Sequence, residues 1–283
     1  MSQDSFVERF HKGYSQTMSM DRPICCLEGD QDLLIFENSI WGRVMALDGV
    51  IQSTERDEFI YSEMFAHVPL LSMDNPSSVL IIGGGDGAVL REVLKHQSVQ
   101  KVVLVEFDMN VIQTTKEYLP NHCENAFEDD RLELIVGDGF DFVHENKFKF
   151  DVILCDSTDP IGAAAKLFSD QFYALCLDSL SSQGVMMTQN GVSMLQLDQL
   201  VKGYHSMERI FDYNGVVFAN VPTYTGGMMS LAWGGFVKLE DNTLSAIQQR
   251  FSQSGIKTQY YNPQMHLASM AMPQYIIKEI NQH

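Results

Sequence analysis

Apolar runs alternate with amphipathic segments from residue 77 onward. The run VLIIGG is apolar throughout, which is typical of a parallel strand that is covered on both faces. Helix-like stretches such as AVLREVLKHQ and VIQTTKEYL separate it from similar runs. The expected strands span residues 79–84, 101–108, 132–138, 151–156 and 184–190. Strands that alternate with helices in this way predict an α/β fold with a doubly wound parallel sheet.

The first 70 residues follow a different pattern. Short apolar runs are interrupted at the tripeptide ENS and at Asp48-Gly49. An Asp-Gly pair between apolar runs is a strong hairpin signal, so we predict a small antiparallel sheet over residues 5–54. Helical spacing follows in ERDEFIYSEMFAHVPLL. We therefore place a domain boundary between a β-sheet domain, residues 1–56, and a larger α/β domain, residues 57–283.

The last third of the chain contains further elements. A helix is expected around residues 168–180, before the fifth strand. Residues 215–224 and 228–236 have the character of an antiparallel pair. Residues 243–254 and 273–281 are predicted to be surface helices.

The charge balance changes the list of expected partners. The chain has 37 acidic and 19 basic side chains among 283 residues, a net charge of −18. Such a chain repels nucleic acid and anionic membranes and attracts cations. It has no run of 18 apolar residues and no apolar stretch at its start, so we expect neither a membrane span nor a signal peptide. Five cysteines without a CxxC pair, and histidines without ligand spacing, favour a cytoplasmic protein with no metal site.

A glycine-rich turn lies between the first strand and the first helix of the α/β part. The sequence IIGGGDGAVLREV places four glycines there, which permit positive φ and close approach of a ligand to the backbone. Asp86 inside this turn disfavours a phosphate group, because like charges repel. A cationic adenosine compound, such as an S-adenosyl sulfonium, fits better.

Acidic residues follow three further strands. Glu106 lies 21 residues after Gly85, where an acid can accept hydrogen bonds from both ribose hydroxyls. Asp138 ends the next strand, and Asp156 and Asp159 follow the fourth. Each acid alone could be a helix N-cap. Because parallel strands end at the same edge of a sheet, we expect these carboxylates to form one cation-binding rim there.

The motifs GGGDGAVLREV, ALDGVIQSTERDEFIYSEM, DSTDPIG and VPTYTGG, in this order, resemble those of spermidine synthase. The resemblance runs from about residue 10 to the last helix. It implies a small N-terminal antiparallel β-domain, a Rossmann-like methyltransferase-type domain, and a homodimer or homotetramer. It also implies transfer of the aminopropyl group of decarboxylated S-adenosylmethionine, a co-substrate, to putrescine. The products that it implies are spermidine and 5′-methylthioadenosine, and it implies no tightly bound cofactor or metal.

The resemblance also assigns residues to the donor. Gln31 and Gln52 are expected near the methylthioadenosine moiety, Glu106 at the ribose, and Asp86 at the ammonium of the aminopropyl arm. The remaining donor-site residues, in the glycine turn and at the adenine, are Gly83, Gly85, Asp138 and Gly139.

The acceptor site is implied in the same way. Asp156 stands at the position of the family's proton acceptor. The residues that match the family's diamine contacts are Tyr61, Asp159 and Tyr224. Further expected substrate-binding residues are Ser62, Ser157, Thr158 and Trp233, the last lining an apolar slot. Two departures from the family pattern stand out. Ser62 replaces the histidine that is usual in bacterial relatives, and alanines follow DSTDPIG where relatives have proline and a small residue.

Other functions remain open at this point. The acceptor could be another amine, such as cadaverine, spermidine or agmatine, since Ser62 makes a roomier end of the site conceivable. A small-molecule methyltransferase would share the sheet, but Asp86 would then face the carboxylate of its cofactor. A non-catalytic polyamine-binding module would bind without releasing methylthioadenosine.

Overall fold

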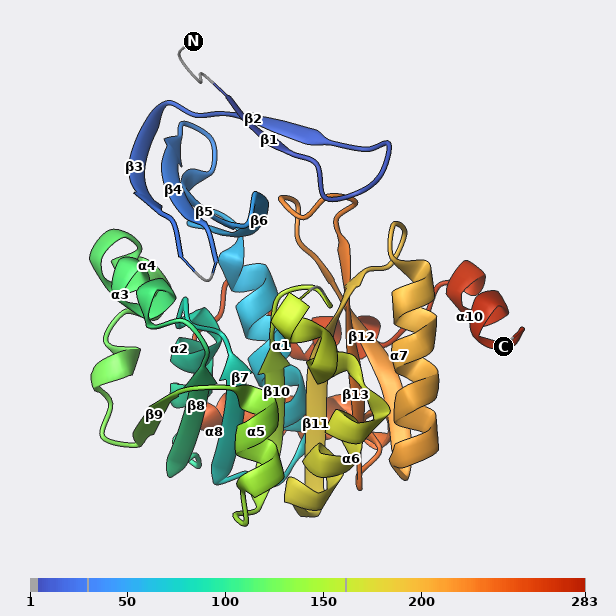
Figure 1. Cartoon of the computed structure of the whole chain (residues 1–283). Helices are drawn as coiled ribbons and strands as arrows, with labels where there is room; N and C mark the ends of the chain where they lie inside the picture. The colour runs from blue at the N-terminus through green and yellow to red at the C-terminus, as the bar shows by residue number, and fades with distance from the viewer. Residues whose placement is uncertain (1–4, 30, 161, 283) are drawn as a thin grey trace.

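The computed structural model describes residues 5–29, 31–160 and 162–282. Two small antiparallel sheets lie above a large sheet that carries helices on both faces (Figure 1). Within the described residues, no helix has both the length and the apolar character needed to cross a membrane.

The N-terminal part contains two sheets, where the sequence predicted one. A two-stranded sheet consists of β1 (Ser5–Glu8) and β2 (Gln16–Ser19). A four-stranded sheet consists of β3 (Arg22–Leu27), β4 (Leu33–Asn38), β5 (Gly42–Leu47) and β6 (Val50–Thr54). Pro23 has no N–H to donate, and the register shifts beside it, so β3 is an edge strand that does not continue the ladder to β2.

The predicted hairpin between β5 and β6 is confirmed. Asp48 and Gly49 both have positive φ, 50° and 76°, as a two-residue type I′ turn requires. The hairpin brings Val50 to Thr54 alongside β5, and this edge of the small sheet faces the large domain (Figure 1).

The large sheet has seven strands in the order β12-β13-β11-β10-β7-β8-β9. Their bounds are β7 (Ser78–Gly83), β8 (Lys101–Glu106), β9 (Leu132–Val136), β10 (Phe150–Asp156), β11 (Leu180–Val192), β12 (Tyr213–Asn220) and β13 (Met228–Gly235). The strands from β9 across to β11 are parallel, which confirms the predicted parallel sheet. The predicted antiparallel pair is also confirmed, and β13 lies between β11 and β12.

Helices cover both faces of this sheet, as the doubly wound pattern predicted. One face packs against α1 (Glu58–Ser72), α2 (Ala88–Leu94) and α8 (Leu244–Ser254). The other packs against α5 (Gly139–Glu145), α6 (Asp170–Ser179) and α7 (Leu197–Ile210). Helices α8 and α10 (Gln274–Ile280) confirm the two predicted C-terminal helices.

Several short elements had no sequence prediction. They are α4 (Pro120–Cys123), α9 (Pro263–Ala268) and the 3₁₀ segments Ala126–Glu128, Gly162–Phe168 and Leu239–Asp241. Helix α3 (Met109–Tyr118) contributes Val111 to a small core shared with β4 and β5, which joins the two domains. The carboxyl ends of the parallel strands therefore meet the N-terminal sheets along one boundary (Figure 1).

Candidate active site

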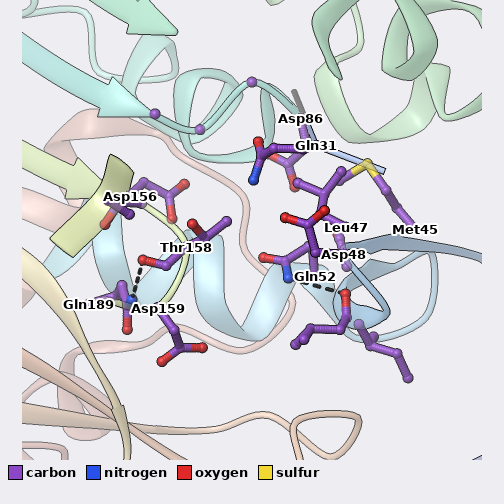
Figure 2. Close-up of a pocket in the computed structure, with 18 of the residues that line it drawn as sticks. Gln31, Met45, Leu47, Asp48, Gln52, Asp86, Asp156, Thr158, Asp159 and Gln189 are labelled. Atoms are coloured by element: carbon purple, nitrogen blue, oxygen red, sulfur yellow. Dashed lines mark hydrogen bonds between the residues drawn. The ribbon is translucent and has the colours of Figure 1, made fainter. Parts of the chain in front are cut away.

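A cavity of about 800 Å³ lies at this boundary. The connection between β3 and β4 contributes Gln31, strand β6 contributes Gln52, and helix α1 contributes Tyr61. The rest of the lining comes largely from the carboxyl ends of the parallel strands. Figure 2 shows Asp156, Thr158 and Asp159 on one side and Gln31 and Gln52 on the other. All the acids that the sequence placed on one rim, from Asp86 to Asp159, line this cavity.

The glycine turn fits tightly against the end of β10. Gly83 has φ +78°, and a Cβ there would lie 2.2 Å from the backbone oxygen of Asp156. The N–H of Gly84 donates to that oxygen at 3.0 Å. Only glycine satisfies both the backbone conformation and the close approach at position 83. The N–H of Ala88 donates to Oδ1 of Asp86 at 3.0 Å, so this side chain is fixed at the start of α2 while it lines the cavity.

Glu106 is buried at the end of β8, with 7% of its surface exposed. Its Oε1 accepts the N–H of Asp108 at 2.9 Å. Burial raises the pKa of Glu106 to about 7, although backbone N–H groups oppose this effect. A Cβ at Gly85 would lie 2.7 Å from Oε2 of Glu106, so the glycine turn leaves room for this carboxylate.

Asp138 serves as a helix cap, one of the simple roles considered from the sequence. Its Oδ1 accepts the N–H of Phe140 at 2.9 Å at the start of α5. Its Oδ2 forms an ion pair with Lys166. Burial acts to raise the pKa of Asp138, but the Lys166 ammonium and the backbone N–H groups outweigh it and lower the pKa. A Cβ at Gly139 would lie 2.3 Å from Cγ2 of Ile82, so close packing on β7 requires glycine here.

Asp156 is the last residue of β10. The hydroxyl of Tyr61 donates to its Oδ1 at 2.7 Å. Burial raises the pKa of Asp156 to about 7, and the nearby charges of Asp86 and Glu106 add to this effect, whereas the Tyr61 hydrogen bond opposes it. A carboxylate with this pKa is a better proton acceptor at neutral pH than an ordinary aspartate.

Two tyrosines flank the carboxylates. The rings of Tyr61 and Tyr224 meet edge to face, with centroids 6.1 Å apart. The hydroxyl of Tyr224 donates to the backbone oxygen of Gln52 at 2.8 Å, a contact between the two domains. Asp159 lies near this group, and Gln196 donates to its Oδ1 at 2.6 Å. Burial raises the pKa of Asp159, with Gln196 and His11 opposing and Glu8 reinforcing the shift.

Two protein-family models match this chain. A model of the spermine/spermidine synthase domain matches residues 58–244, and one of the spermidine synthase tetramerisation domain matches residues 29–55. The chain belongs to the spermine/spermidine synthase family. A polyamine aminopropyltransferase of Erwinia tasmaniensis is 44% identical, with 98% of each chain covered. Polyamine aminopropyltransferase 1 of Pseudomonas aeruginosa is 47% identical, with 97% of each chain covered.

Solved structures of spermidine synthases have the same fold. One, in complex with the transition state analogue AdoDATO, superposes with a TM-score of 0.93 at 35% identity and covers 100% of this chain and 97% of that chain. The spermidine synthase of Thermotoga maritima gives a TM-score of 0.90 at 34% identity, covering 100% of this chain and 96% of that chain. These matches confirm the Rossmann-like methyltransferase-type fold with its N-terminal β-domain.

Two residues that the family resemblance assigned to substrate lie outside this cavity. Trp233 is completely buried in β13, within the core between the sheet and α1, so the expectation that it lines an apolar slot of the site is wrong. Ser62 is also completely buried, and its hydroxyl donates to the carboxylate of Glu58 at 2.9 Å. Since Ser62 faces Glu58, it has no direct access to a ligand in the cavity.

The cavity also contains polar residues that the sequence did not indicate. Glu8 is 4% exposed, and it accepts the N–H of Ile51 at 2.9 Å and the hydroxyl of Thr225 at 2.7 Å. Glu58 pairs with Arg91 at 3.0 Å, and burial raises its pKa to about 7. Further polar lining residues without a sequence prediction include Asp57, Gln189 and Gln196. Helix spacing did suggest the Glu58 helix, but no pattern indicated which of its sides meets the cavity.

Histidine and cysteine side chains do not gather into a metal site in the described part of the chain. His67 contacts His96 at 2.9 Å and Glu92 at 3.1 Å inside the core. His122 contacts Ser53 at 2.8 Å, and His266 contacts Tyr261 at 2.7 Å. Each of these buried rings therefore has a polar partner within the protein.

Proposed function

We propose that this protein is a spermidine synthase, which transfers the aminopropyl group of decarboxylated S-adenosylmethionine to putrescine. One observation carries the proposal. Asp156, held by the Tyr61 hydroxyl at 2.7 Å, faces the same cavity as Asp86, Glu106 and Asp159. Asp86 and Glu106 come from two other turns, and their charges raise the pKa of Asp156, so the cavity favours cationic ligands.

The donor is placed along the glycine turn. Glu106 accepts hydrogen bonds from the ribose hydroxyls, and Asp138 and Gly139 contact the adenine ring. Gln31 and Gln52 contact the methylthioadenosine part, and Asp86 holds the ammonium of the aminopropyl arm. Gly83 and Gly85 let the ligand approach the backbone. What supports this placement is that all eight residues line one continuous cavity.

The acceptor is placed beside Asp156. Tyr61, Asp159 and Tyr224 surround the diamine, with Ser157 and Thr158 forming the wall between the two aspartates. The carboxylates of Asp156 and Asp159 suit a molecule that carries two ammonium groups. Ser62 takes no direct part, because its hydroxyl is bonded to Glu58.

The reaction needs a neutral amine. A primary alkylammonium has a pKa of about 10.4, judged by lysine, so it must lose a proton before it attacks. Asp156 accepts that proton, and its raised pKa of about 7 reduces the mismatch with the amine. The nitrogen then forms a bond to the carbon beside the sulfonium while the carbon–sulfur bond breaks. The bonding pair stays on sulfur, and methylthioadenosine leaves as a neutral thioether without protonation.

The proposal extends to assembly, domain organisation and location. We expect a homodimer or homotetramer in the cytoplasm, with the boundary between the β-domain and the catalytic domain at residues 56 and 57. The tetramerisation domain model that matches residues 29–55 supports self-association. The five cysteines are all free thiols, which suits a reducing compartment.

Incubation with decarboxylated S-adenosylmethionine and a panel of amines tests the function. With putrescine, mass spectrometry should detect spermidine and methylthioadenosine in equal amounts. The panel includes cadaverine, spermidine and agmatine, and intact S-adenosylmethionine serves as the control for methyl transfer. A product with only another amine, or methylation of the amine, would refute the assignment.

The Asp156→Asn variant tests the proton acceptor. Turnover should fall by at least about a hundredfold, the lower end of general-base contributions. Binding of methylthioadenosine, measured by calorimetry, should persist because Asp156 makes no assigned contact with that product. Full activity in the variant would rule out this role for Asp156.

A further inference from the structure

The side chain of Gln196 bridges the end of β11 and the loop after β10. Its Oε1 accepts the N–H of Val192 at 2.7 Å, and its Nε2 donates to Oδ1 of Asp159 at 2.6 Å and to Gln199 at 3.1 Å. A backbone N–H can only donate, so the bond to Val192 fixes which end of the amide is oxygen. The amide nitrogen must then face Asp159.

Local backbone geometry makes room for this amide. Gly191 has φ +75°, and a Cβ there would lie 2.8 Å from Cδ of Gln196. Any other residue at position 191 would be strained and would push the amide away. The space at the end of β11 is therefore shaped around the Gln196 side chain.

A second glutamine holds the same loop. Oε1 of Gln189 accepts the N–H of Gly191 at 2.9 Å, and its Nε2 donates to the backbone oxygen of Thr158 at 3.1 Å, as Figure 2 shows. Both glutamines line the cavity. Two amides, Gln189 in β11 and Gln196 just after this strand, thus hold consecutive residues of the loop. Gln189 binds the backbone of Thr158, and Gln196 binds the carboxylate of Asp159.

We propose that Gln196 is a positioning residue for the acceptor amine, acting through Asp159 to set where an alkyl diammonium ligand is held. The proposal rests on the proposed function. Oδ1 of Asp159 is occupied by Gln196, and in the described part of the chain Oδ2 forms no hydrogen bond, so Oδ2 is the oxygen offered to an ammonium group. The hydrogen bond from Gln196 also favours the ionised form of Asp159, as does the nearby His11. Burial and the charge of Glu8 act in the opposite direction.

The Gln196→Met variant keeps the side-chain length and removes the donor. A hydrogen bond to a charged group is strong enough that its loss should raise the KM for putrescine by about tenfold or more. The KM for decarboxylated S-adenosylmethionine and the kcat should stay within about twofold, because no donor-site contact changes. Gln196→Asn, which keeps the amide but is too short to bridge both partners, should have the same effect. Met194→Gln, an exposed position in the same segment, is the matched control and should leave all three constants unchanged.

A double-mutant cycle with Asp159→Asn separates this role from a general structural one. In the Asp159→Asn background, Gln196→Met should have little further effect on the KM for putrescine. An unchanged KM in both Gln196 variants, a full additional loss in the double mutant, or an equal rise in the KM of the donor would each overturn the proposal. If the unmodified enzyme makes no product from putrescine at all, the proposed function fails instead.

Discussion

The hydrogen bond from Tyr61 to Asp156 offers a direct test of how the pKa of the proposed proton acceptor is set. Tyr61→Phe removes the hydroxyl that donates to Oδ1 of Asp156 at 2.7 Å. The ring, which packs on Phe65 with centroids 5.2 Å apart, is retained. The variant therefore changes the electrostatics of one carboxylate and leaves the packing in place.

The magnitude follows from the bond that is lost. A hydrogen bond to a charged group contributes about 1.5–3 kcal/mol, and about 1.36 kcal/mol corresponds to one pKa unit. This bond favours the ionised form, so its loss should raise the pKa of Asp156 from about 7 by roughly one to two. At pH 7 the ionised fraction would fall from about a half to roughly 1–10%, a loss of about 5- to 50-fold. At pH 9 Asp156 would be almost fully ionised in the parent and at least about half ionised in the variant, so the loss should shrink to about twofold or less.

The assay measures kcat/KM for putrescine between pH 6 and 9.5 at saturating donor. At each pH, the value for the variant is divided by the value for the parent enzyme. The ratio cancels the titration of the free amine, which rises toward high pH for both enzymes. Tyr224→Phe is the matched control, because its hydroxyl donates to Gln52 and not to Asp156. Its ratio should be the same at every pH, whatever its value. A flat ratio for Tyr61→Phe would refute the claim that Tyr61 tunes Asp156.

Two predictions concern the nucleoside half of the site. Glu106 has a pKa of about 7, and we propose that its ionised form accepts hydrogen bonds from the ribose hydroxyls. Calorimetry should then show methylthioadenosine binding that weakens as the pH falls through 7. Glu106→Gln should weaken binding by about tenfold at pH 8 and remove this pH dependence; a pH dependence that survives would mean that another group is responsible. Gly85→Ala should also weaken methylthioadenosine about tenfold, because its Cβ would lie 2.7 Å from the Glu106 carboxylate and displace it. The melting temperature should change little, since a flexible side chain can move aside, and unchanged affinity would show that this carboxylate does not bind the ribose.

The fold class and the rim of acids were readable from the sequence for a simple reason. Parallel strands covered on both faces need continuous apolar runs, and these runs mark each strand. All parallel strands end at one edge, so acids that follow consecutive runs must lie together. The glycine turn with Asp86, and then Glu106, Asp138 and Asp156, could be placed at one site on this basis alone.

Other features depend on which side of an element faces the cavity, and the sequence carries little information about that. Strand β13 is buried on both faces, so no alternation shows that Trp233 belongs to the core. Helix α1 is buried from Ile60 to Ser72, so no apolar stripe shows that Tyr61 faces Asp156 while Ser62 faces Glu58.

Contacts between distant segments were decided by the tertiary structure alone. Glu8 reaches the cavity because the N-terminal strands fold over the carboxyl edge of the large sheet, where Thr225 bonds to it. Gln196 meets Asp159 across 37 residues of chain because β10 and β11 are neighbours in the sheet. Local pattern determined the strands and the acids that follow them, since each strand needs its own apolar run. The partners of those acids were decided by packing, because a hydrogen bond between remote segments leaves no periodic trace in the sequence.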